Sequence, residues 1–184
     1  LVMPIAALVI GDSVLGAEVR AGSFYFTWLS PAPAWQIVLG RWVGGSTVAL
    51  VTIAPCAAAA AFIAGSPSSA GAAFVAAAVG SIAYVAVFIA IGCLTRRTAV
   101  WSLAFVFLVE RLLGAALTGI AQLSPTWEAR AIFVGLLDDP PNRLHRSGIP
   151  EGTDAVVRLL VVTAVVLVIA NWRMRRLRLS GAAD

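Results

Sequence analysis

The chain has 184 residues, of which 60% are hydrophobic and 12% are charged, and its formal net charge is +4. A soluble domain carries about 25% charged residues, so this chain has too few polar side chains to cover a water-facing globule. Lipid must cover much of its surface. The composition therefore excludes an ordinary soluble domain and indicates a membrane protein.

Arginine supplies all 13 basic residues, because the sequence contains no lysine. The phosphate-binding loop of an NTPase needs a lysine after its glycines to reach the β- and γ-phosphates. This chain therefore does not draw energy from ATP through such a loop. The arginines cluster beside apolar runs, and membrane topology explains that placement better than nucleic-acid binding does.

The first apolar run, Leu1–Gly11, is short for a membrane span. A spanning helix needs about 20 residues, and this run supplies about half of them. It also begins without the basic leader that a signal peptide has. We expect residues 1–13 to be the second half of a helix whose beginning precedes this sequence.

An aromatic segment, residues 14–42, follows the half-span. Phe24 and Trp28 are four residues apart, which places both rings on one face of a short helix, and Pro31 ends that helix. Aromatic side chains of this kind favour the membrane surface. The pattern by itself fits a helix that merely anchors the chain at the interface.

Four further stretches are long and apolar enough to cross a bilayer. They are Val43–Ala64, Gly71–Leu94, Ala99–Ile120 and Ala155–Trp172. Small residues are frequent in them, and in lipid helices are held together by close backbone approach at small side chains. We expect an all-α fold: one polytopic transmembrane helical bundle over residues 1–184, with about five membrane segments, one of them incomplete.

The positions of the arginines predict how these segments are oriented in the membrane. They gather between the half-span and the first complete span, between the second and third complete spans, and in a basic tail at residues 173–184. In an alternating topology these three places lie on one side of the membrane. The positive-inside rule assigns that side to the cytoplasm, so we predict a multi-pass protein with a cytoplasmic C-terminus.

Glu110 and Arg111 fall near the middle of the third complete span. Either charge costs about 2.5–3.5 kcal/mol at the bilayer centre on insertion scales. Adjacent helical residues point about 100° apart, so the two charges do not neutralise each other well. Each needs a partner elsewhere, and two interpretations stay open: they line a transport pathway or subunit interface, or they form structural ion pairs within the bundle.

The outer side of the membrane receives residues 121–154. Ser124 can cap a helix there, Pro125 suits its first position, and Asp138–Pro141 ends it. One face of that helix is apolar: Ala129, Ile132, Phe133, Leu136 and Leu137. We expect a short amphipathic helix that lies against the outer membrane surface or against the bundle.

Reactive side chains are few. The lone His145 lies in a proline-rich loop, and Cys56 and Cys93 fall in apolar runs, so none of them has metal-site spacing. No span contains the histidine that an intramembrane serine protease needs. Asp12 stands alone on the cytoplasmic side, where a headgroup transferase needs several acids. We predict no metal site and no enzymatic activity in this chain.

The segment from Gly16 to Arg41 resembles the loop after the second helix of ABC-2 type transporter permeases. In that family an acidic residue, a basic residue and Gly-Thr or Gly-Ser precede a short helix. Ser-Pro and an Ile/Val-Leu-Gly-Lys/Arg entry into the third helix follow. The matching residues here are Glu18, Arg20, Gly22, Ser23, Ser30, Pro31, Leu39, Gly40 and Arg41. The layout of the remaining chain is similar, although a six-helix permease has a first helix and part of a second that this chain lacks.

The resemblance implies the permease subunit of an ATP-driven exporter in a bacterial-type plasma membrane, with a drug, lipid or glycan as cargo. In the family this loop is a coupling helix that docks on a cytoplasmic ABC ATPase subunit, which binds the ATP and Mg, so this chain itself holds no cofactor. Carried over, the coupling residues are Glu18, Arg20, Gly22, Phe24, Trp28, Ser30 and Pro31. A second permease, identical or related, and the lipid bilayer are the other implied partners, and no nucleic acid is. The alternative is a non-transporting membrane scaffold or assembly factor, which needs no ATPase.

Overall fold

The computed structural model describes residues 2–16, 32–64, 67–95, 97–137 and 147–176. Within these ranges the secondary structure is helical, without strands. The helices are α1 Val2–Gly11, η1 Asp12–Gly16, α4 Ala34–Ala64, α5 Pro67–Leu94, α6 Thr98–Ala104, η2 Phe105–Leu113, α7 Gly114–Ala116, α8 Thr118–Ala121, α9 Pro125–Gly135 and α10 Thr153–Arg176. Two of them, η1 and η2, are π-helices.

Three of the described helices, α4, α5 and α10, are long and apolar enough to cross a membrane. The mean hydropathy of their most apolar windows is 2.1, 2.5 and 2.3. This confirms the all-helical fold and the membrane-type composition of three of the predicted spans. α1 is also apolar but too short to span, as expected from its sequence.

The third complete span predicted, Ala99–Ile120, is not one continuous helix. It is divided into α6, η2, α7 and α8, and the helical path is interrupted at Leu117, whose φ of −122° and ψ of 114° are those of extended backbone. Gly114 and Gly119 flank the interruption, and glycine is about 1 kcal/mol less favourable than alanine in a helix. A bundle of five membrane segments is therefore not confirmed.

Two helices extend beyond the spans predicted for them. α4 begins at Ala34, so the last part of the expected loop segment 14–42 belongs to this helix. Its first turns are packed rather than free: Arg41 Nη1 donates a hydrogen bond to the carbonyl of Val14, and Trp42 Nε1 donates to the carbonyl of Ile82 at 3.2 Å. α10 continues to Arg176, so its last turn takes the start of the expected tail 173–184.

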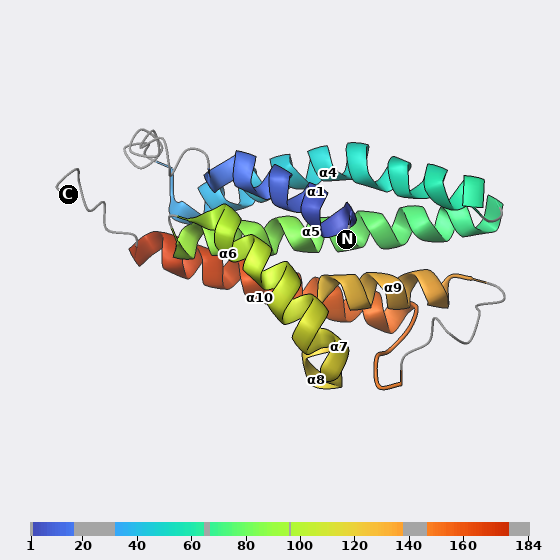
Figure 1. Ribbon diagram of the computed structural model, residues 1–184. Helices are drawn as coiled ribbons and strands as arrows, with labels where there is room; N and C mark the ends of the chain where they lie inside the picture. The colour runs from blue at the N-terminus through green and yellow to red at the C-terminus, as the bar shows by residue number, and fades with distance from the viewer. Residues whose placement is uncertain (1, 17–31, 65–66, 96, 138–146, 177–184) are drawn as a thin grey trace.

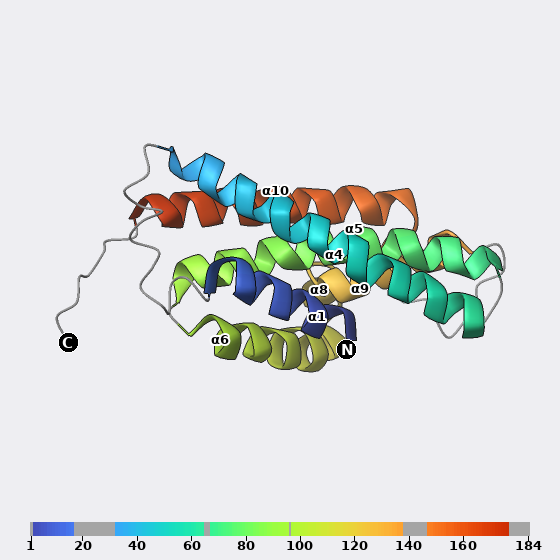
Figure 2. The same ribbon diagram turned by 90° about the horizontal axis from the view of Figure 1, so that it is seen from above.

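The centre of the bundle is α5. In its most apolar window 72% of the residues are buried, compared with 17% in α4 and 22% in α10. Figures 1 and 2 show α5 between α4, α1 and α10, with α6 and η2 crossing the bundle obliquely. Close contacts occur at glycines: a Cβ added to Gly11 would lie 2.6 Å from Phe88 Cβ, and one added to Gly45 would lie 2.9 Å from Val85 Cγ1.

The short helix α9 packs against the bundle, which is one of the two positions left open by its sequence. It packs against α5 and α10 and runs beside α10 in Figure 1. Ser124 caps it and Pro125 occupies its first turn, as predicted. Ala129 and Ile132 are buried, whereas Leu136 is 48% exposed. The helix ends at Gly135, and the predicted stop, Asp138–Pro141, lies outside the described residues.

Candidate functional site

The side chain of Glu110 turns into the bundle from the π-helix η2 and is only 3% exposed. Its Oε1 accepts two hydrogen bonds, one from Ser124 Oγ at 2.6 Å and one from the backbone N–H of Thr126 at 3.0 Å. Both donors belong to the first turn of α9. The free N–H groups and the positive end of the dipole at a helix N-terminus favour a carboxylate there.

Ser124 connects this carboxylate to the helix cap. Its hydroxyl donates to Glu110 and accepts a hydrogen bond from the backbone N–H of Trp127 at 3.4 Å. The serine is 3% exposed, so both interactions are shielded from solvent. The Ser-Pro start of α9 therefore does more than cap a helix: it supplies the hydroxyl that holds the acid of η2.

A third element, α5, reaches the same place through Tyr84. The hydroxyls of Tyr84 and Thr126 share a hydrogen bond, and the Tyr84 ring stacks on Phe88 with 5.5 Å between centroids. Tyr84 has no exposed surface. We call Tyr84, Glu110, Ser124 and Thr126 the polar junction, because their hydrogen bonds join α5, η2 and α9.

Arg111, the next residue on η2, has different surroundings. It is exposed and makes no hydrogen bond or ion pair with another residue of the described ranges. Glu110 is held by hydroxyl and amide donors, so these two neighbouring charges take different surroundings, in keeping with the angle between adjacent helical side chains.

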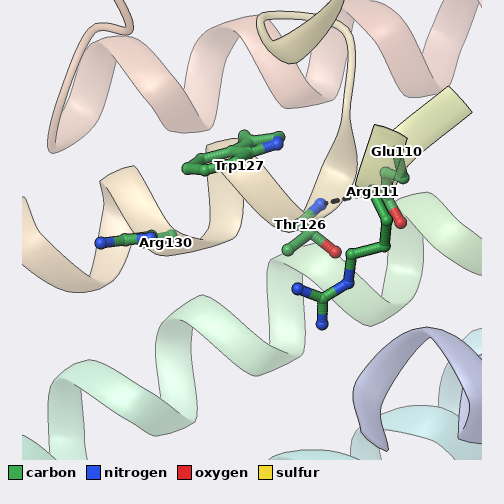
Figure 3. Close-up of a pocket in the computed structure, with 5 residues that line it drawn as sticks. All are labelled: Glu110, Arg111, Thr126, Trp127 and Arg130. Atoms are coloured by element: carbon green, nitrogen blue, oxygen red, sulfur yellow. Dashed lines mark hydrogen bonds between the residues drawn. The ribbon is translucent and has the colours of Figure 1, made fainter. Parts of the chain in front are cut away.

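A cavity of about 260 Å³ adjoins the polar junction and is lined by Glu110, Arg111, Thr126, Trp127 and Arg130 (Figure 3). The Arg130 guanidinium carbon lies 5.4 Å from the centroid of the Trp127 ring, a cation–π arrangement. Gly114 lets α7 approach this ring, since a Cβ there would lie 3.1 Å from Trp127 Nε1. Two arginines and one already satisfied acid give the cavity wall a net positive charge, which suits an anionic ligand.

Glu128, on α9, was not singled out by the sequence. It has no exposed surface, and both carboxylate oxygens are without a hydrogen-bond partner among the described residues. Burial raises the pKa of this carboxyl from 4.5 to about 7, and the nearby charge of Arg158 opposes that rise. The sequence did contain one signal for Glu128: it is a charged residue directly before Ala129, where the predicted apolar face of α9 begins.

The structure brings Glu110 and Arg111 to one cavity, but it does not place the other predicted site residues. Glu18, Arg20, Gly22, Phe24, Trp28, Ser30 and Pro31 all lie outside the described residues. Sequence reasoning missed Tyr84, Trp127 and Arg130, because an aromatic or basic residue in an apolar helix does not reveal which distant segment it meets.

Comparison of the sequence with family models, and of the chain with characterised proteins and with solved structures, finds no significant match.

Proposed function

We propose that the chain is the membrane-spanning permease subunit of an ATP-driven ABC exporter, and that a separate ATPase subunit supplies the energy. Three observations support this: helices with the length and composition of membrane spans, the coupling-like sequence from Glu18 to Pro31, and a charged cavity beside a buried polar junction. The cavity carries most weight, because charges within apolar segments are costly and mark transport pathways by default.

In this proposal a second permease subunit pairs with the chain, and each binds an ATPase at the loop between η1 and α4. Glu18 and Arg20 make polar contacts with the ATPase, and Phe24 and Trp28 transmit its movement while staying at the membrane surface. Arg41 would relay movement from the loop, since it joins α4 to η1 through the carbonyl of Val14.

The test is purification of the tagged chain in mild detergent from membranes of its own host, with identification of co-purifying proteins. A soluble ATPase should appear in near-equal amount. Glu18→Ala should reduce its recovery by about tenfold, the loss expected for one charge-assisted hydrogen bond. Asp154→Ala, which removes an exposed acid at the start of α10, is the matched control and should recover the ATPase fully.

Recovery of well-folded chain without any ATPase would favour the alternative, a scaffold or assembly factor. If the Glu18→Ala variant and the wild type recover equal amounts of the ATPase, the permease function stands but Glu18 does not contribute to the coupling contact.

A further inference from the structure

The cavity beside the polar junction lies at membrane depth. The Tyr84–Thr126 hydrogen bond places the cavity next to α5. Tyr84 is ten residues from Leu94 at one end of this helix and seventeen residues from Pro67 at the other end. At 1.5 Å per residue these separations are about 15 Å and about 25 Å. The apolar core of a bilayer is about 30 Å thick, so neither end of α5 brings the cavity to bulk water.

Arg111 is a charge at this depth that has no partner among the described residues. The acid next to it, Glu110, is buried and already accepts hydrogen bonds from Ser124 and Thr126. No other described residue provides a hydrogen bond or an ion pair to Arg111. An arginine in an apolar environment needs an anionic partner or water, so this charge must be satisfied from outside the described chain.

Arg130 and Trp127 extend the cationic wall along α9. Arg130 lies one helical turn beyond Thr126, and its guanidinium is held beside the Trp127 ring. Figure 3 shows the side chains of Arg111 and Arg130 at opposite ends of the row of lining residues, with Trp127 between them along the helix. A ligand that contacts both arginines must therefore reach from η2 to α9.

The surroundings of Arg111 are apolar. Leu108 and Leu112, which flank it on η2, are 55% and 62% exposed. A ligand that satisfies the arginines and also covers these leucines has an anionic head and a hydrocarbon chain. Guanidinium groups match the oxygens of phosphate with paired hydrogen bonds.

We propose that this cavity binds the phosphate-bearing head group of an amphiphile, with Arg111 and Arg130 as the cationic contacts and the acyl chain along Leu108 and Leu112. The inference that such an amphiphile is the exported cargo rests on the permease function proposed above. The binding of the amphiphile does not depend on that function, and it can be measured on the isolated chain.

The test uses the full chain in mild detergent, with lipid binding followed by native mass spectrometry. Two probes share their acyl chains: dioleoylphosphatidylglycerol, which carries a phosphate, and dioleoylglycerol, which does not. Arg111→Gln and Arg130→Gln should each weaken phosphatidylglycerol binding by about tenfold. Dioleoylglycerol binding should not change. Arg97→Gln, an exposed arginine before α6, is the matched control and should bind like the wild type.

Equal phosphatidylglycerol binding by the wild type and by both cavity variants, all with unchanged unfolding midpoints, would overturn the site. Inorganic phosphate distinguishes the sources: phosphatidylglycerol binding that persists in millimolar phosphate supports a lipid ligand. Arginine-dependent binding of phosphate, together with arginine-independent binding of phosphatidylglycerol, would assign the site to free phosphate and overturn the amphiphile. If lipid binding depends on the arginines but no ATPase co-purifies, the proposed permease function is contradicted and the proposed lipid site stands. If an ATPase co-purifies but lipid binding does not depend on the arginines, only the proposed lipid site is contradicted.

Discussion

Two regions of this bundle are held together by different means. Where α5 meets α1 and α4, glycines allow close contact with Phe88 and Val85, and the packing is apolar. Where η2 meets α9, a buried carboxylate is satisfied by a hydroxyl and a backbone amide. Close packing in the apolar region requires that the glycines have no side chain. The polar junction instead requires particular hydrogen-bond donors and acceptors. Substitutions that add bulk should break the first, and substitutions that remove acceptors should break the second.

The largest effect is expected at the polar junction. Glu110→Leu leaves the hydroxyl of Ser124 and the N–H of Thr126 buried without their acceptor, so the free energy of unfolding should fall by about 3 kcal/mol. Leu112→Ala changes an exposed residue of the same helix and should have little effect. SDS titration of both variants in mixed micelles measures the difference. Equal stability of the two would show that the junction contributes nothing.

The apolar region should respond to added bulk at one of two adjacent glycines. A side chain at Gly45 meets Val85, whereas nothing lies within 4 Å of a Cβ at Gly44. Gly45→Leu should lower the free energy of unfolding by about 2 kcal/mol through overpacking. Gly44→Leu should be neutral or slightly stabilising, because leucine favours helix more than glycine does. The same SDS titration applies, and a reversed order would mean that α4 does not pack on α5 through this face.

A smaller effect is expected where α5 joins the polar junction. Tyr84→Phe removes the hydroxyl that pairs with Thr126 and should cost about 1 kcal/mol. Thr126→Val removes the same interaction from the other side. In a double-mutant cycle the two losses should therefore fail to add. Full additivity would show that this hydrogen bond is not formed.

A further effect is a pH dependence at Glu128, which should appear over only part of the pH range. Because the pKa of the folded carboxyl is about 7 and its ordinary value is 4.5, the folded chain keeps a proton that the unfolded chain releases. Stability should therefore fall as pH rises from about 4.5 to about 7, and then level off. Glu128→Gln should flatten this slope in unfolding titrations at several pH values. A slope that persists in the variant must come from another group.

The sequence predicts local features of this chain better than distant ones. The start of α9 was predictable, because a capping serine and a first-turn proline act within one helical turn. The contacts of the first turns of α4 were not, because the hydrogen bond from Arg41 joins them to the carbonyl of Val14 in another element.

The candidate site divides in the same way. The charge of Glu110 and Arg111 in an apolar stretch identified both as residues that need partners. Their surroundings depend on the interruption at Leu117, which lets α9 return against α5 and α10. No spacing rule in the sequence connects Glu110 to Tyr84 or Arg130, so those contacts required the structure.

The π-helix η2 makes the number of residues in this segment as important as their identity. Its nine residues form wider turns than an α-helix, with hydrogen bonds from residue i to i+5. Loss of one residue would restore ordinary α-helical turns and rotate everything on one side of the deletion by about 100° relative to the other. Glu110 would then leave the N-terminus of α9, and a different side chain would face it. Insertions and deletions between Phe105 and Leu113 should therefore be tolerated less well than substitutions of the exposed leucines there.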